Sequence, residues 1–238
     1  MRKHISFFTI ATIVVFFFSV SAVKSQTTDS AAVKVEQGTI DELPAKPFRL
    51  PALAEINGSP FLTADYQQGA VELGQGKVVT GVPVKFNIFN NAVMVLKNGE
   101  ELKLEFFELV SYDQADNSGN IKHVMFKAGY PEVDGHDDNS VYQVLSLGPK
   151  VHLLKFMSQK VEDAATLGDY SRKEIITTAQ LYIYTPGGKI KKIKNSKQAL
   201  QDALPELAAK IDEVATAKKL KLKSESEISV LVEELNKP

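Results

Sequence analysis

Hydrophobic residues between about Gly58 and Ile193 occur in short stretches that are separated by turn-forming residues. Such spacing is typical of a sheet-rich domain. Within it, the segment 101–106 alternates strictly between charged and apolar residues, which predicts a strand with one buried face. The inward side chains are Leu102, Leu104 and Phe106, and the outward side chains are Glu101, Lys103 and Glu105.

Glycine and asparagine mark the predicted hairpin turns. Gly74-Gln75-Gly76 separates strands 69–73 and 77–79, Asn90-Asn91 separates strands 84–89 and 92–96, and Lys97-Asn98-Gly99-Glu100 forms the next turn. The segment 113–120 is polar enough to be a loop. Further strands are predicted at 121–128, 141–147, 151–157, 175–184 and 189–193. No helix of crossover length lies between the strands, so we expect an antiparallel sheet, either an open barrel or a sandwich.

The apolar period changes near residue 196. Apolar residues from Ala199 to Val214 recur at intervals of three and four, and Pro205 fits the first turn of a helix or a kink. Ser224 and Glu227 form a capping-box pair ahead of a further apolar stripe, Ile228, Leu231, Val232 and Leu235. The fold class predicted is therefore α+β, a mainly antiparallel sheet with a C-terminal helical tail.

The N-terminus has the pattern of a cleavable signal peptide. Arg2 and Lys3 precede the apolar segment 5–18, and small residues favour cleavage after Ala22 or Ser25. An uncleaved anchor is the alternative reading. The predicted organisation is a signal peptide at 1–25, a flexible linker or arm at 26–56, an antiparallel β domain at 57–195 and a helical segment at 196–238. We therefore expect an exported protein, periplasmic or secreted, with no stable membrane span after cleavage.

Composition removes several classes of function. The 238-residue chain contains no cysteine, which excludes thiol catalysis, cysteine-ligated zinc and disulfide scaffolds. Its formal charge of −1 provides no general attraction to nucleic acid. A lysine run between Lys189 and Lys197 lacks the interleaved aromatic or arginine residues of a nucleic-acid reader and is better explained as a solvated strand edge. No nucleic-acid partner is predicted.

Two groups of residues are candidates for a site. Asp134, His136 and Asp138 lie on one short glycine-containing loop whose oxygen and imidazole groups could bind a divalent cation such as calcium, although a plain turn explains the same residues more simply. Apart from that cation, no cofactor is predicted. Tyr182 and Tyr184 share one strand face, which forms either a binding surface or a packing surface for the helical tail. No nucleophile, metal or phosphate motif identifies a catalytic residue.

Several segments resemble an uncharacterised family of exported proteins common in Bacteroidetes. They include Asn57-Gly58-Ser59-Pro60-Phe61-Leu62, Val141-Tyr142-Gln143-Val144-Leu145 and Leu181-Tyr182-Ile183-Tyr184. The resemblance covers nearly all of the chain after the arm, and it implies an envelope or secreted location without implying a mechanism. It departs at the end of the last helix, which reads Glu234-Leu235-Asn236, where aromatic residues are expected before the asparagine.

The leading functional hypothesis is an exported, non-enzymatic envelope protein that binds a partner protein or a cell-surface polymer. Export, an extended arm, many strands and the lack of a reactive motif favour it. The alternative hypothesis is a hydrolase or metal-dependent enzyme that uses the carboxylate and histidine cluster near 134–138. The sequence leaves the ligand and the oligomeric state open.

Overall fold

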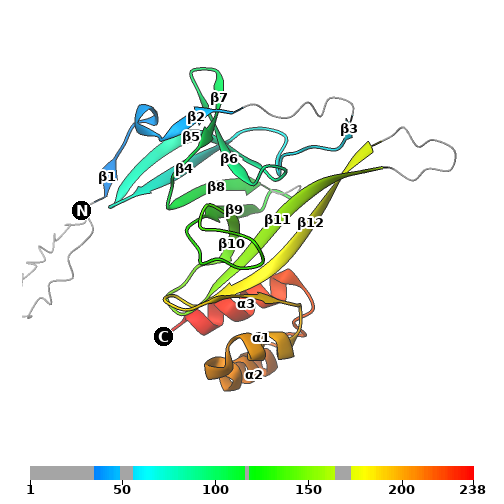
Figure 1. The fold of residues 1–238 in the computed structure, drawn as a ribbon. Coiled ribbons are helices and arrows are strands. Elements are labelled where there is room, and N and C mark those ends of the chain that lie inside the picture. The colour runs from blue at the N-terminus through cyan, green and yellow to red at the C-terminus, as the bar shows by residue number, and fades with distance from the viewer. Residues whose placement is uncertain (1–34, 49–55, 116–117, 164–172) are drawn as a thin grey trace, which may run out of the picture. The chain divides into compact units, whose positions relative to one another are not determined.

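The computed structural model describes residues 35–48, 56–115, 118–163 and 173–238. The described strands form one open sheet, whose main path has the order β13-β12-β11-β10-β9-β8-β4-β5-β6-β7-β2 (Figure 1). Neighbours along this path are antiparallel, and two short strands, β1 and β3, pair in parallel with β5 and β12. Helices follow at the C-terminal end. The structure confirms the predicted α+β class and the open, mainly antiparallel sheet.

The elements have the following bounds. The strands are β1 (Glu36–Gln37), β2 (Ala45–Pro47), β3 (Ile56–Asn57), β4 (Gln67–Gly74), β5 (Lys77–Asn87), β6 (Ala92–Lys97), β7 (Glu100–Leu104), β8 (Leu109–Ala115), β9 (Ile121–Lys127), β10 (Tyr142–Ser146), β11 (His152–Asp163), β12 (Lys173–Tyr184) and β13 (Ile190–Ile193). The helices are α1 (Lys197–Ala203), α2 (Ala208–Ala217) and α3 (Glu225–Asn236), with short 3-10 turns at Ile40–Glu42 and Pro205–Leu207.

Two of the hairpin turns form as their residues predict. Asn98 and Gly99 have φ angles of 52° and 82°, and Gln75 and Gly76 have φ angles of 52° and 78°. Positive φ at both central residues defines a type I′ turn, whose twist matches that of the flanking strands. These turns join β6 to β7 and β4 to β5.

The strand β5 is longer than predicted, because it continues through Gly81 and Pro83. Gly69 pairs with Val82 and Ala70 with Thr80, so Gly81 is an additional residue in a β-bulge, and its φ of 69° suits glycine. Pro83 lies between the residues that pair with β1 and those that pair with β6, where one edge of β5 has no neighbour among the described strands. A sheet tolerates proline at such a position.

The prediction that Phe106 faces inward is wrong. Strand β7 ends at Leu104, the alternation breaks, and the Phe106 side chain is 59% exposed. Its neighbour Phe107 is buried in its place. The predicted loop at 113–120 is also partly wrong, since residues 113–115 continue strand β8.

The N-terminal part that precedes the β domain adds edge strands to the sheet. β2 pairs with β7 at one end of the main path, and Pro47 lies in this edge strand, where its missing N–H is tolerated. Leu43 is buried against the core, so the described residues 36–47 of the predicted arm are part of the folded structure. The predicted signal peptide lies outside the described residues.

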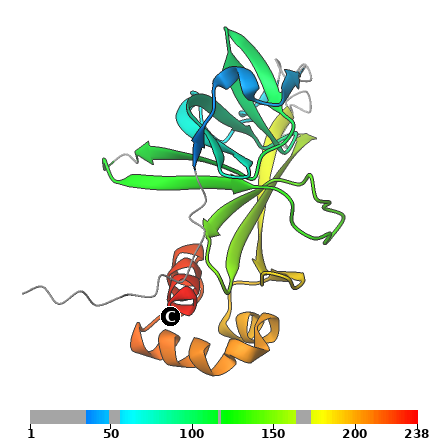
Figure 2. The same cartoon turned by 90° about the vertical axis from the view of Figure 1, so that its left-hand side faces the viewer.

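The helical tail packs on one face of the strands β11 to β13 (Figure 2). Leu153, Leu181 and Ile183 contribute to this core from the sheet. The predicted apolar stripe of α3 also lies in this core, with the residues Ile228, Leu231, Val232 and Leu235. Ser224 caps α3 by accepting a hydrogen bond from the Glu227 amide, and Pro205 begins a 3-10 turn, as predicted. Among the described residues, no helix has the length and apolar character needed to cross a bilayer.

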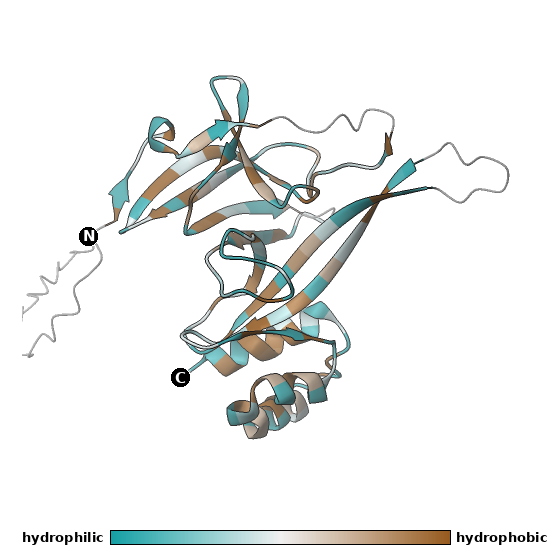
Figure 3. Cartoon of the chain, in the orientation of Figure 1, coloured by the Kyte–Doolittle hydropathy of each residue, from teal (hydrophilic) through white to brown (hydrophobic). Residues whose placement is uncertain are grey.

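The opposite face of β10 to β12 is lined mainly by aromatic residues. Successive residues of β11 and β12 point to opposite sides of the sheet, and hydrophobic residues occur in both strands (Figure 3), so each strand contributes side chains to both clusters. The residues that β10 to β12 contribute to this second face are Tyr142, Val144, Leu154, Phe156, Tyr182 and Tyr184. Tyr130 and Val133 pack on them from the loop that joins β9 to β10.

Candidate functional site

Residues 128–141, which we name the covering loop, lie over the aromatic face of the sheet. The amide of Gly129 donates to the carbonyl of Asp138 at 2.7 Å and closes the loop at its base. At its tip, Val133 pairs with His136 across Asp134 and Gly135, which have φ angles of 51° and 80°. The Asp-Gly pair therefore forms a type I′ turn, the geometry for which it is a preferred sequence.

The tip of the loop forms one side of a depression of about 350 Å³, which we name the His136 cleft. The sheet forms the other side. Its lining residues are Asp134, His136, Phe156, Ser158, Thr178, Ala179, Gln180, Tyr182 and Lys192. Three of the predicted site residues, Asp134, His136 and Tyr182, are thus brought together.

The carboxylate of Asp134 is held by the sheet beneath it. The Tyr182 hydroxyl donates to Asp134 Oδ2 at 3.0 Å, and Lys192 Nζ lies 3.4 Å from the same oxygen. The hydrogen bond from Tyr182 and the nearby Lys192 charge lower the pKa of the Asp134 carboxyl. Tyr182 itself is 2% exposed, so its hydroxyl anchors the loop and its ring is covered.

His136 is fixed by a second set of contacts. Its Nδ1 lies 2.9 Å from the Tyr142 hydroxyl, and its ring stacks on Phe156 with 3.7 Å between centroids. Burial lowers the pKa of His136, because the charged imidazolium loses hydration, although the Asp134 charge opposes this effect. Burial also raises the pKa of Tyr142 to about 12.

Tyr184 lies farther along the same aromatic cluster, beside Tyr130 and His152. Its ring lies edge-on to Tyr130 at 5.1 Å and to His152 at 5.2 Å, and the Tyr130 hydroxyl lies 3.1 Å from His152 Nδ1. Both predicted binding tyrosines therefore pack under the covering loop. The helical tail, which was the other predicted packing partner, lies on the opposite face of the sheet.

Asp138 does not share the His136 cleft, because it lies at the base of the loop and lines a different depression. The structure therefore separates it from Asp134 and His136. Across the described ranges, no three histidine or acidic side chains lie close enough together to hold a metal ion.

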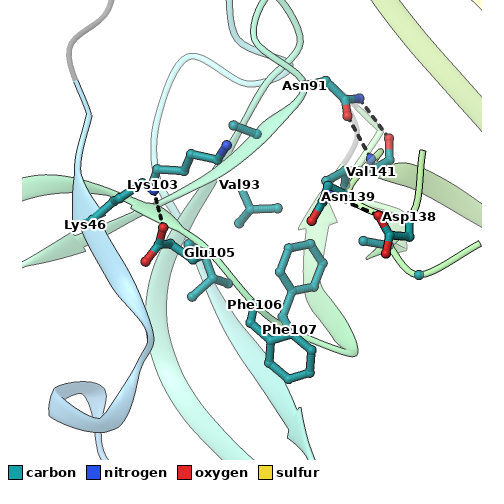
Figure 4. A pocket seen from close by; sticks show the side chains of 14 residues that line it. Lys46, Asn91, Val93, Lys103, Glu105, Phe106, Phe107, Asp138, Asn139 and Val141 are labelled. Carbon is teal, nitrogen blue, oxygen red and sulfur yellow. Dashed lines mark hydrogen bonds and ion pairs between the residues drawn. The ribbon is translucent and has the colours of Figure 1, made fainter. Parts of the chain in front are cut away.

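The depression that Asp138 lines has a volume of about 370 Å³, and we name it the Phe106 cleft (Figure 4). Strands β2, β6 and β7 form part of its wall, and the base of the covering loop completes it. Its lining residues are Lys46, Asn91, Ala92, Val93, Lys103, Leu104, Glu105, Phe106, Phe107, Ala128, Gly129, Asp138, Asn139 and Val141.

Anchored neighbours hold Phe106 at this cleft. The amide of Glu105 donates to the carbonyl of Pro44 at 2.8 Å, which ties the chain to the N-terminal edge segment. On the other side Phe107 is buried, with 7% exposure. Phe106 therefore projects from a fixed backbone, and a ligand that covered its ring would recover hydrophobic free energy.

Asn91 joins the two sides of the cleft. Its Nδ2 donates to the Val141 carbonyl at 2.9 Å, and its Oδ1 accepts from the Val141 amide at 2.7 Å. The side-chain amide thus forms the same two hydrogen bonds with Val141 that a paired residue of an antiparallel strand would form. Its backbone has a φ of 47°, a conformation that asparagine adopts more readily than most residues.

The polar groups beside Val141 are also held in place. Asp137 Oδ1 accepts from the Asn139 amide at 3.1 Å and from the Ser140 hydroxyl at 3.0 Å. Asn139 Nδ2 then donates to Asp138 Oδ1 at 3.0 Å. These bonds orient the carboxylate and the amide at the cleft before any ligand arrives.

Comparisons with known proteins identify no relative of the chain. No family model, no curated protein and no solved structure matches the chain.

The sequence pattern does not reveal the Phe106 cleft. It indicates Asp138 as a candidate metal ligand and places Phe106 in the core. The available signal was the pair Phe106-Phe107 at the end of an alternating segment, since only one of two adjacent residues in an extended chain can face the core.

Proposed function

We propose that the protein is an exported, non-enzymatic envelope protein that binds a cell-surface polymer or a partner protein through the Phe106 cleft. The exposed Phe106 ring beside oriented polar groups is the observation that carries this proposal. Exposed single hydrophobic residues are ordinary, but this ring lies on a concave surface whose walls are tied together. The predicted signal peptide supports an envelope or secreted location.

The contacts of the His136 cleft give its loop residues a structural role. Asp134 Oδ2 accepts from Tyr182, and His136 Nδ1 bonds to Tyr142, so these atoms hold the covering loop in place. The non-enzymatic proposal rests on the Phe106 cleft, and a hydrolase or metal-dependent enzyme that uses the cluster near 134–138 is the alternative.

Capture of envelope material by the immobilised mature protein tests the proposal. We compare the wild-type protein with Phe106→Ala and with Ile121→Ala, which removes a side chain that is 65% exposed on β9 and outside the cleft. The expected result is capture by the wild type and by Ile121→Ala, with strongly reduced capture by Phe106→Ala. Equal capture by both variants, or no capture by the wild type, would overturn the proposal.

A further inference from the structure

We propose that the ligand of the Phe106 cleft is an uncharged polysaccharide, bound through its pyranose rings. This inference rests on the proposed function and narrows the ligand to one chemical class. It follows from three properties of the cleft: its balance of charges, its oriented hydrogen-bonding groups and its exposed aromatic ring.

The charged side chains of the cleft sum to zero. Lys46 forms an ion pair with Glu105, and the remaining charges are those of Lys103 and Asp138. None of the ion pairs between described residues involves Lys103. A cleft for phosphate or nucleic acid carries a positive excess, and one for a cation carries a negative excess. Balanced charge favours a neutral, polar ligand.

The free polar atoms suit hydroxyl groups. Asp138 Oδ1 accepts from Asn139, and no hydrogen bond within the described part of the chain reaches Asp138 Oδ2. That oxygen can accept from a ligand hydroxyl, and Lys103 can donate to one. Because the turn at Asp137 and the bond from Asn139 already orient the Asp138 carboxylate, a ligand loses little free energy in ordering that group.

The Phe106 ring supplies the apolar part of the site. A pyranose ring presents C–H groups on its faces, and the electron-rich face of an aromatic ring attracts the positive edges of such groups. With hydroxyls around its perimeter and C–H groups on its faces, a pyranose matches both kinds of surface in the cleft. The volume of about 370 Å³ lies toward the lower end of small-molecule sites and suits a short stretch of a polymer.

Titration of the isotope-labelled mature protein with neutral oligosaccharides tests this inference by nuclear magnetic resonance. The probes are cellotetraose, maltotetraose and 1,4-linked mannotetraose at millimolar concentration. We expect at least one probe to shift the amide signals of Phe106 and Asn139. Affinity should fall about tenfold in Phe106→Ala and in Asp138→Asn, remain in Phe106→Trp, and stay within about twofold in Ile121→Ala. If no probe shifts these signals, or if Phe106→Ala binds as the wild type does, the saccharide assignment is wrong.

Treating the envelope fraction with periodate or with protease before capture distinguishes a failure of this inference from a failure of the proposed function. Periodate cleaves vicinal diols of saccharides, and protease removes proteins. Loss of Phe106-dependent capture after periodate, with capture retained after protease, supports the polysaccharide. Loss only after protease would overturn the polysaccharide and leave the proposed function standing with a protein partner. Capture that is independent of Phe106 before any treatment would overturn the proposed function itself.

Discussion

Asn236, at the end of α3, pairs with Val151, the residue before β11, through both the oxygen and the nitrogen of its side-chain amide. Nδ2 donates to the Val151 carbonyl at 2.8 Å, and Oδ1 accepts from the Val151 amide at 2.9 Å. Oδ1 also accepts from the Lys150 amide at 3.1 Å. One side chain therefore fixes the C-terminal helix to the sheet.

Replacing Asn236 should destabilise the fold. Asn236→Ala leaves the Val151 amide and carbonyl without their partners, so we expect the free energy of unfolding to fall by about 1–3 kcal/mol. Urea denaturation of the mature protein measures it. Glu233→Ala, an exposed change on the same helix, should stay within about 0.5 kcal/mol.

Gly148 provides a second test of the same contact. A Cβ atom at Gly148 would lie 2.1 Å from Asn236 Cγ, so Gly148→Ala should also be destabilising. Because the clash involves the Asn236 side chain, the double variant should lose clearly less than the sum of the two single losses. Simple additivity would show that the two residues are not coupled in this way.

Asn91 should stabilise the Phe106 cleft through its hydrogen bonds to Val141. Asn91→Gly relieves the positive φ and removes both bonds, so we expect a loss of about 1–3 kcal/mol in urea denaturation and weaker binding at the cleft. Asn98→Gly is a matched control, because Asn98 has a similar φ of 52° in a hairpin turn. If both variants were equally stable, the bonds to Val141 would have no measurable role.

The stability of the protein should decrease below about pH 6.5. Burial lowers the pKa values of His136 and His152 from 6.5, so the unfolded chain binds protons that the folded chain does not. The free energy of unfolding therefore falls as the pH drops below the unfolded value. The pKa values of Asp134 and Asp137 are also lowered, and the stability that these carboxylates provide is lost only in a separate pH range, below about pH 4.

Urea denaturation between about pH 7.5 and 5 measures this effect. His136→Gln should reduce the slope of unfolding free energy against pH, because it removes one of the two partly buried imidazoles whose pKa is lowered. Curves of the same slope for the variant and the wild type would contradict the role of His136.

Export should yield a shortened chain. If the leader is removed as the sequence predicts, the mature protein begins at Val23 or Gln26. Intact-mass spectrometry of the protein recovered from the envelope fraction or the medium distinguishes these products. Recovery of a chain that still begins at Met1 would contradict cleavage and favour the uncleaved anchor.

Local patterns predicted those parts of the fold that local chemistry controls. Asn98-Gly99 forms the expected turn because few residue pairs tolerate positive φ twice in succession. Ser224 caps α3 because its hydroxyl lies three residues before the Glu227 amide whose hydrogen bond it accepts. In these cases the interacting groups lie within four residues of each other, so the sequence contains the whole interaction.

The site depended on contacts between distant segments, which periodicity does not reveal. Phe106 was assigned to the core because the alternation was extended by one pair of residues beyond the end of β7. The bonds from Asn91 to Val141 span 50 residues, and the bond from Tyr182 to Asp134 spans 48. Composition identified the loop residues, but only the fold shows that Asp134 and Asp138 line different clefts.

The most direct measurement of binding at the Phe106 cleft uses tryptophan fluorescence. The chain contains no tryptophan, so Phe106→Trp places a single indole at the mouth of the cleft. Addition of solubilised envelope polysaccharide should shift its emission to shorter wavelength in a saturable manner, because the ligand removes water from the ring. Ile121→Trp, which is exposed on β9, should show no such change. No shift at position 106, or the same shift at both positions, would contradict a binding site at Phe106.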